Sequence, residues 1–185
     1  MSDKSDLEQR IASYRLSDPM IILVGPMGAG KTTVGNRLAK RLHLDFVDID
    51  HEIEKMADRS ITKIFELEGE TGFRKRETEA LEAYCCLSGT VISTGGGAIL
   101  SETNRRMMRN GIVIYLHTTP TQQYLRIRKR KHRPNFDPEK PIEKLSDLMK
   151  IREPLYRAEA DYVVNSDNQT VESLTKKIEE YLVNQ

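Results

Sequence analysis

The sequence predicts an α/β protein of three layers, in which helices cover both faces of a parallel β-sheet of five strands. Short apolar segments alternate with segments of helical periodicity along most of the chain. A glycine-rich turn at residues 25–32 joins the first apolar segment to a helix. The length of 185 residues suits one domain with a sizeable core, so we expect a single domain over residues 1–185.

The first strand and helix are predicted at residues 20–24 and 31–42. The strand segment is apolar and ends at a glycine, as expected for a buried central strand. Val34, Leu38 and Leu42 then recur at helical spacing.

The turn between them, Gly25-Pro-Met-Gly-Ala-Gly30-Lys31-Thr32, fills the P-loop pattern Gly-x4-Gly-Lys-[Ser/Thr]. Glycines let the chain turn tightly around a phosphate, and the N–H groups of the helix start point at the anion. Lys31 is placed to reach the outer phosphates and Thr32 to ligate a magnesium ion. An ordinary glycine turn would not account for the full pattern between a strand and a helix. The loop therefore predicts a nucleoside-triphosphate site.

A second strand is predicted at residues 46–50, and its end carries Asp48 and Asp50. Residues two apart on a strand face the same side. One of the two acids could instead cap the helix that begins near His51. Ligands bind at the carboxyl ends of parallel strands, which favours a functional role for both.

A helix is predicted after Ser60 and another at residues 71–87, with a break at Gly69. Arg74 and Glu77 are three residues apart and can pair. The pair could be a surface salt bridge, but the glycines before it place Arg74 early in the helix, near the acidic strand end.

The third strand, residues 90–94, runs into three consecutive glycines, Gly95, Gly96 and Gly97. Three glycines cost more conformational entropy than a plain turn requires. We therefore expect a backbone surface that a ligand touches.

The rest of the chain continues the alternation. A helix capped by Ser101 precedes a strand at residues 112–116, and Thr119 with Pro120 begins another helix. The remaining predictions are a helix at 142–156 with a kink or break at Pro154, a strand at 162–165, a helix at 171–182 capped by Thr170, and a short helix or loose arm at 1–18.

Seven of the eight positions from Arg126 to Arg133 can carry positive charge, and three prolines follow by residue 141. Nucleic-acid binding is one interpretation, but the cluster has no interleaved aromatic residues. A long irregular segment in a compact domain is often a lid. We interpret residues 126–141 as a basic lid that closes on a polyphosphate.

Composition gives no sign of a nucleic-acid or membrane partner. The net charge is +1, and no apolar run approaches the roughly 20 residues that span a bilayer. Cys85 and Cys86 are neighbours, which disfavours a disulfide between them and fits the cytoplasm. We interpret both cysteines as packing residues on a helix.

Together these features predict phosphoryl transfer to a small bound acceptor, a reaction that depends on positioning and charge neutralisation. The chain has no Asn/Thr-Lys-x-Asp element of the kind that regulatory GTPases use for guanine.

Six motifs in this order resemble the shikimate kinase family, a member of the nucleoside monophosphate kinase-like P-loop group. They are Gly25 to Thr32, Asp48-x-Asp50, Gly69-Glu-x-x-Phe73-Arg74-x-x-Glu77, Ser93-Thr-Gly95-Gly96-Gly97, Arg133-Pro134 and Arg152-x-Pro154-x-Tyr156. The resemblance implies a sheet of order 2-3-1-4-5 and ATP-dependent phosphorylation of the 3-hydroxyl of shikimate, in aromatic amino-acid biosynthesis. It also implies a monomer.

The resemblance further implies roles for individual residues. Asp50 would hold the shikimate hydroxyls and act as base or orienting acceptor. Arg74 and Arg152 would bind the substrate carboxylate, with Glu77 holding Arg74. Lys31 and Arg133 would neutralise the transferring phosphoryl group. Asp48 would reach Mg2+ through water while Thr32 ligates it directly. The backbone of Gly95, Gly96 and Gly97 would border the substrate ring, and the nucleotide would contact Gly28, Ala29, Gly30, Lys31, Thr32, Thr33, Arg126 and Arg133.

The chain departs from the family pattern in the lid, and two alternative functions stay open. The family lid usually has two leucines after Arg-Pro, and here Asn135 and Phe136 follow, so lid packing is expected to differ. A gluconate kinase of the same group would keep the P-loop and lid and change the acceptor pocket. A nucleotide-binding module without turnover is the alternative from a different functional class.

Overall fold

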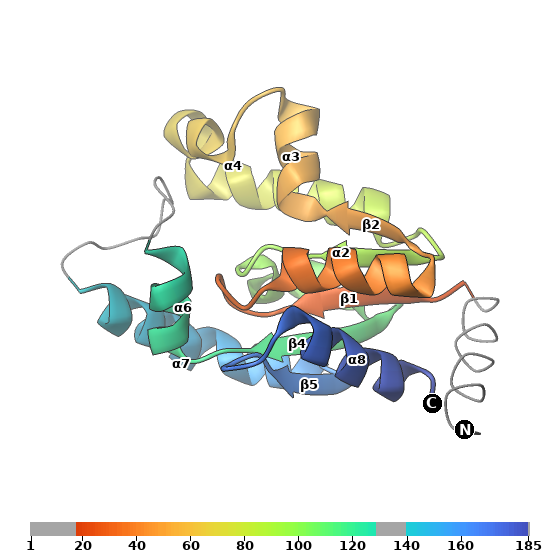
Figure 1. Cartoon of the computed structure of the whole chain (residues 1–185). Coiled ribbons are helices and arrows are strands. Elements are labelled where there is room, and N and C mark those ends of the chain that lie inside the picture. The colour runs from red at the N-terminus through yellow and green to blue at the C-terminus, as the bar shows by residue number, and fades with distance from the viewer. Residues whose placement is uncertain (1–17, 129–139, 185) are drawn as a thin grey trace, which may run out of the picture.

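The computed structural model describes residues 18–128 and 140–184, and its centre is a parallel sheet of five strands in the order β2-β3-β1-β4-β5 (Figure 1). The prediction of the sheet and of its order is confirmed. The strands are β1 (Met20–Val24), β2 (Asp45–Asp48), β3 (Thr90–Ser93), β4 (Ile112–His117) and β5 (Tyr162–Asn165).

Helices alternate with the strands and lie on both faces of the sheet (Figure 1). They are α2 (Lys31–Leu42), α3 (Ile49–Ala57), α4 (Ile61–Tyr84), α5 (Glu102–Met108), α6 (Pro120–Ile127), α7 (Pro141–Glu159) and α8 (Val171–Leu182), with a short 3-10 helix η1 (Ala98–Leu100). The caps predicted at Ser101, Thr119 and Thr170 are confirmed, because each side-chain oxygen accepts from a backbone N–H in the first turn.

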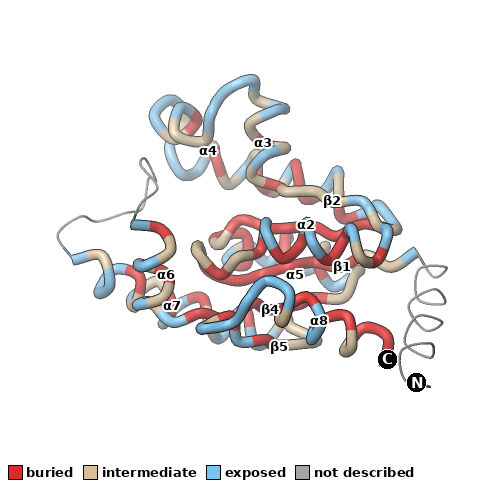
Figure 2. Tube along the Cα trace, viewed as in Figure 1, coloured by how far each residue is buried: buried red, intermediate tan, exposed pale blue. Residues whose placement is uncertain are grey.

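The core has two layers because successive side chains of a strand point to opposite faces. Ile21 and Leu23 of β1 pack with α2 and α8 on one face. Ile22 and Val24 pack with α4, α5 and α7 on the other. Figure 2 shows the burial along β1, where residues 21–24 are almost inaccessible. The sheet therefore holds the carboxyl ends of its strands on a rigid support.

The second strand is shorter than predicted. β2 ends at Asp48, and Asp50 lies in the first turn of α3 instead of at the end of the strand. The reason is the cap: Asp48 accepts hydrogen bonds from the N–H groups of Asp50 and His51, which starts the helix two residues earlier.

Helix α7 passes through Pro154 and ends at Glu159, so the predicted end near Tyr156 is wrong and the structure shows no break at the proline. Leu145, Met149, Arg152 and Tyr156 of this helix are buried. Their helical spacing keeps one face of α7 packed on the core, which offsets the loss of one backbone hydrogen bond.

The predicted break at Gly69 is confirmed, because this residue has non-helical angles (φ 68°, ψ −173°) inside α4. Cys85 packs in the core as predicted, although it lies just beyond the helix, and the prediction of Cys86 as a packing residue is wrong. Cys85 is buried and follows the last residue of α4, whereas Cys86 is exposed. Burial raises the pKa of the Cys85 thiol to about 11, which keeps it protonated and unreactive.

The predicted N-terminal helix or arm and the central part of the predicted lid, which includes Arg133, Asn135 and Phe136, lie outside the described residues.

Candidate active site

The P-loop connects β1 to α2 as the sequence predicted. Gly30 precedes the helix with φ 97° and ψ 14°, a left-handed conformation that glycine adopts without strain. Lys31 is 8% exposed, and its Nζ donates to the carbonyls of Gly25 and Pro26 over 2.7 and 2.9 Å. The ammonium group is thus held over the loop whose N–H groups would face a phosphate.

Asp48 connects this loop to the start of α3. Its Oδ2 accepts a hydrogen bond from Thr32 Oγ1 over 2.7 Å. Its Oδ1 accepts from the backbone N–H of Asp50 over 3.1 Å. The carboxylate therefore caps the helix, which the sequence left open, and it also contacts the P-loop threonine, which the sequence did not indicate.

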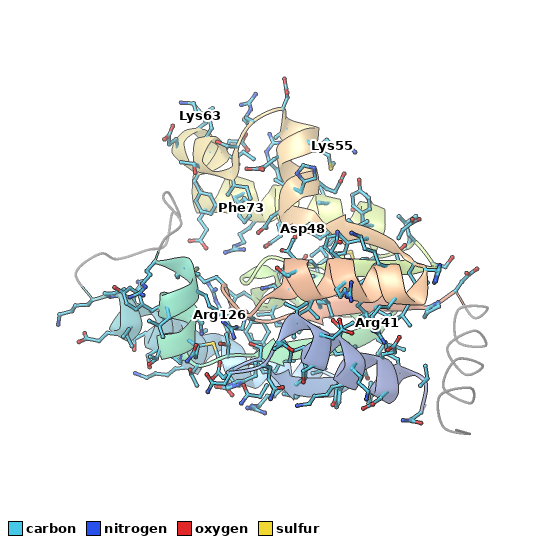
Figure 3. The ribbon with its side chains drawn as sticks, in the orientation of Figure 1. Arg41, Asp48, Lys55, Lys63, Phe73 and Arg126 are labelled. Atoms are coloured by element: carbon cyan, nitrogen blue, oxygen red, sulfur yellow. The ribbon has the colours of Figure 1, made fainter. Side chains whose placement is uncertain are left out.

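A cavity of about 330 Å³ lies beside the P-loop. Figure 3 shows two residues that line it, Asp48 at the start of α3 and Arg126 on α6. The predicted nucleotide residues that line this cavity are Gly28, Ala29, Gly30, Lys31, Thr32, Thr33 and Arg126.

A second cavity of about 330 Å³ adjoins the first, and Met27, Asp50 and Gly96 line both. All of the predicted acceptor residues line the second cavity, namely Asp50, Arg74, Gly95, Gly96, Gly97 and Arg152. Asp50 therefore lies at the boundary between the two cavities.

Arg74, which is partly exposed, and Glu77, which is buried, form an ion pair at the second cavity. Arg74 Nη1 donates to Glu77 Oε2 over 2.7 Å, and Glu77 is fully buried. The pair is therefore no surface salt bridge. Arg74 also donates to Glu70 over 3.2 Å, which holds the guanidinium from a second side. Burial raises the pKa of Glu77, although the charge of Arg74 opposes the shift.

The glycine segment gives these side chains their space. A Cβ at Gly97 would lie 2.5 Å from Arg74 Cζ, so the guanidinium rests directly on the backbone. A Cβ at Gly95 would lie 2.5 Å from Glu77 Oε1 and 3.0 Å from Asp50 Oδ1. Glycine is needed here because the polar groups of the site approach the backbone closely.

Arg152 of α7 lines the same cavity and is 7% exposed. Its Nε is buried and has no hydrogen-bond partner among the described residues. A buried guanidinium with an unused donor is a ready partner for an anionic group.

Arg126 contacts protein groups that the sequence did not indicate. It donates to the carbonyl of Gly28 over 2.9 Å, to Ser166 Oγ over 3.0 Å and to Ser166 O over 2.6 Å. The side chain thereby joins α6, the P-loop and the segment after β5. Ser166 carries no motif signal, and only the topology brings it to Arg126.

The oxygen donors beside the P-loop fit a magnesium ion. Mg2+ is usually held by one or two carboxylates together with substrate phosphates. Thr32 and Asp48 supply a hydroxyl and a carboxylate 2.7 Å apart. Within residues 18–128 and 140–184, no group of three or more His, Cys, Asp or Glu side chains could hold a metal. The pair therefore suits a magnesium ion whose remaining ligands would come from the phosphates of a nucleotide.

Comparisons with known proteins agree on one family. A family model described as shikimate kinase matches residues 27–183. A shikimate kinase of Thioalkalivibrio sulfidiphilus is 46% identical over 87% of this chain and 85% of its own length. A shikimate kinase of Pasteurella multocida is 47% identical over 89% of this chain and 95% of its own length.

The same family appears among solved structures. The shikimate kinase from Acinetobacter baumannii in complex with shikimate superposes with a TM-score of 0.90 and 44% identity, over 94% of this chain and 97% of that one.

Proposed function

This chain belongs to the shikimate kinase family, and on that premise we propose that it transfers the γ-phosphoryl group of ATP to the 3-hydroxyl of shikimate. The products are shikimate 3-phosphate and ADP, and the reaction belongs to the route to chorismate and the aromatic amino acids. The chain is thus a phosphotransferase with an alcohol group as acceptor.

One observation carries the proposal: Asp50 and Gly96 line both a cavity at the P-loop and a cavity with two arginines. The first cavity has the groups that a triphosphate needs. The second has a carboxylate for hydroxyl groups and guanidinium groups for a carboxylate. Shikimate is a compact ring with three hydroxyls and one carboxylate, and it matches that second set.

In the proposed reaction the 3-hydroxyl oxygen attacks the γ-phosphorus as the bond to the β-phosphate oxygen breaks. ADP leaves with that oxygen, and the hydroxyl proton passes to the Asp50 carboxylate where Asp50 is the base, or to water where Asp50 only orients the hydroxyl. Asp50 either accepts this proton directly or orients the hydroxyl, because its position between the cavities supports both functions.

Arg74 of α4 and Arg152 of α7 hold the carboxylate of shikimate. Glu77 fixes Arg74 through the 2.7 Å hydrogen bond, and Glu70 accepts hydrogen bonds from the other edge of the guanidinium. Arg152 brings a buried and unused Nε donor. Gly95, Gly96 and Gly97 then border the ring without side chains that would fill the cavity.

On the donor side, Lys31 and the N–H groups of the P-loop neutralise phosphate charge, and Arg133, which lies outside the described residues, would add its own positive charge. Gly28, Ala29, Gly30, Thr32, Thr33 and Arg126 complete the nucleotide contacts. A bound Mg2+ would offset charge on the phosphates. Thr32 would ligate the ion directly, and Asp48 would hold it through water.

The described part of the chain contains no helix long and apolar enough to cross a membrane. We propose a monomer of one domain in the cytoplasm, with shikimate and ATP as its partners and no nucleic acid. Sedimentation at several protein concentrations tests the monomer, and a mass that doubles with concentration would contradict it.

A coupled assay of ADP release tests the function. ATP and Mg2+ are supplied with shikimate, gluconate or a nucleoside monophosphate as acceptor. We expect turnover with shikimate and only background ADP release with the other two. No turnover with shikimate would overturn the proposal. Comparable turnover with gluconate would instead support the activity of a gluconate kinase.

A further inference from the structure

Tyr156 of α7 is fully buried, and its hydroxyl makes a specific polar contact. Its hydroxyl donates to the carbonyl of Gly96 over 2.5 Å, across 60 residues of sequence. Burial raises the pKa of this phenol, so the hydroxyl keeps its proton and stays a donor. The sequence singled out Tyr156 only as the last residue of a motif, with no function attached to it.

Gly96, whose carbonyl accepts this hydrogen bond, lies between the two cavities of the site. Gly96 lines both cavities. Its α-carbon packs against the P-loop, since a Cβ there would lie 3.3 Å from the nitrogen of Met27 and 3.5 Å from the carbonyl oxygen of Gly25. A trans peptide directs its C=O and N–H to opposite sides. By holding the Gly96 carbonyl, Tyr156 also fixes the direction of the Gly97 N–H.

Tyr156 and Arg152 lie on the same face of α7, because they are four residues apart in a helix. Both are buried, and the Arg152 guanidinium is near enough to influence the phenol electrostatically. The hydrogen bond to Gly96 therefore fixes the helix that carries Arg152 against the glycine segment that borders the same cavity.

We propose that Tyr156 is a positioning residue for the binding of shikimate. Its phenolic hydroxyl fixes the position of Arg152 relative to the backbone of residues 95–97. The inference rests on the proposed function, because it assigns Tyr156 to the acceptor side of that reaction. Tyr156 needs no contact with substrate for this purpose.

The chain contains a matched control. Tyr115 of β4 stacks on Tyr156, with ring centroids 4.9 Å apart and planes 24° apart. It is equally buried, and its hydroxyl has no hydrogen-bond partner among the described residues. Removing that hydroxyl keeps the stacked ring and breaks no hydrogen bond to the site.

The experiment compares Tyr156→Phe, Tyr115→Phe and the wild type in steady-state kinetics with shikimate and ATP varied separately. We expect Tyr156→Phe to lower kcat/KM for shikimate about tenfold, mainly through KM, as the loss of one buried hydrogen bond implies. KM for ATP should change less than twofold, because Lys31 holds the P-loop through its own bonds to Gly25 and Pro26. Tyr115→Phe should match the wild type in both.

A double-mutant cycle separates positioning from general destabilisation. In an Arg152→Ala background, Tyr156→Phe should lose at least half of its effect on kcat/KM for shikimate, since the group that it positions is gone. An undiminished effect in that background would overturn the proposal. So would a Tyr156→Phe variant with normal shikimate kinetics, or one with equal losses for both substrates and an unfolding midpoint lowered in proportion. Absence of shikimate turnover in the wild type would instead refute the proposed function.

Discussion

Asp48 accepts a hydrogen bond from the Thr32 hydroxyl over 2.7 Å while it caps the first turn of α3 with its other carboxylate oxygen. One side chain thus links the P-loop to the helix that carries Asp50. Three hydrogen bonds to Asp48, from Thr32 Oγ1 and from the N–H groups of Asp50 and His51, join the P-loop to the start of α3. A change at Asp48 is expected to affect metal binding and helix stability separately.

We expect Asp48→Asn to raise the Mg2+ concentration for half-maximal activity about tenfold, because the amide keeps the cap but loses the negative charge that attracts the ion. Asp48→Ala should raise it similarly and also lower the free energy of unfolding by about 1 kcal/mol, through loss of the cap. Magnesium titrations of the initial rate and urea unfolding of both variants measure the two effects. An unchanged magnesium requirement in the Asn variant would remove Asp48 from the metal site.

Asp50→Asn should keep ATP binding and lower kcat by about 10² to 10⁴, the range typical of a positioned proton acceptor. The amide is the appropriate substitution because it keeps the size of the carboxylate and removes its charge and basicity. Titration with a fluorescent ATP analogue checks nucleotide binding, and single-turnover kinetics measure the chemical step. An unimpaired rate of that step would exclude Asp50 from the chemistry.

Arg152→Ala should raise KM for shikimate about 10- to 100-fold, since charged hydrogen bonds contribute roughly 1.5 to 3 kcal/mol each. Arg157→Ala is the matched control on the same helix. That arginine is half exposed and pairs with Glu153 at 2.7 Å, and exposed pairs contribute little. Its removal should leave KM unchanged. Equal KM values for the Arg152 variant and the wild type would contradict the proposed binding of the carboxylate.

Local patterns predicted the parts of the fold that depend on neighbouring residues. The P-loop, the three N-caps and the break at Gly69 each follow from a short stretch of chain. Tertiary packing decided the continuation of α7 through Pro154, and a cap decided the early start of α3. Short-range sequence patterns do not predict the packing that continues α7, and they only suggest the cap that starts α3.

The candidate site divides in the same way. Local patterns indicated Asp50 and Arg74, the family resemblance added Arg152, and the structure brings all three to one cavity. The partners Ser166 and Gly96 could not be predicted, because they meet Arg126 and Tyr156 only through the fold. The glycines at 95–97 were expected to face a ligand, yet two of them also make room for Glu77, Asp50 and Arg74. This second need for glycine could not be predicted, because it depends on contacts between segments that are far apart in the sequence.

The contact of Gly97 with Arg74 leads to the last prediction. Gly97 has φ −99° and ψ −10°, which any residue can adopt, so the space above it decides the effect of a substitution. A Cβ there would lie 2.5 Å from Arg74 Cζ, and the guanidinium would have to move. Gly97→Ala should therefore raise KM for shikimate about tenfold or more, with KM for ATP nearly unchanged. In an Arg74→Ala background the same substitution should have little further effect, because the group that it displaces is absent. Steady-state kinetics of the two single variants and the double variant measure this coupling. Equal factors in both backgrounds would show that Gly97 affects shikimate by a route that does not involve Arg74.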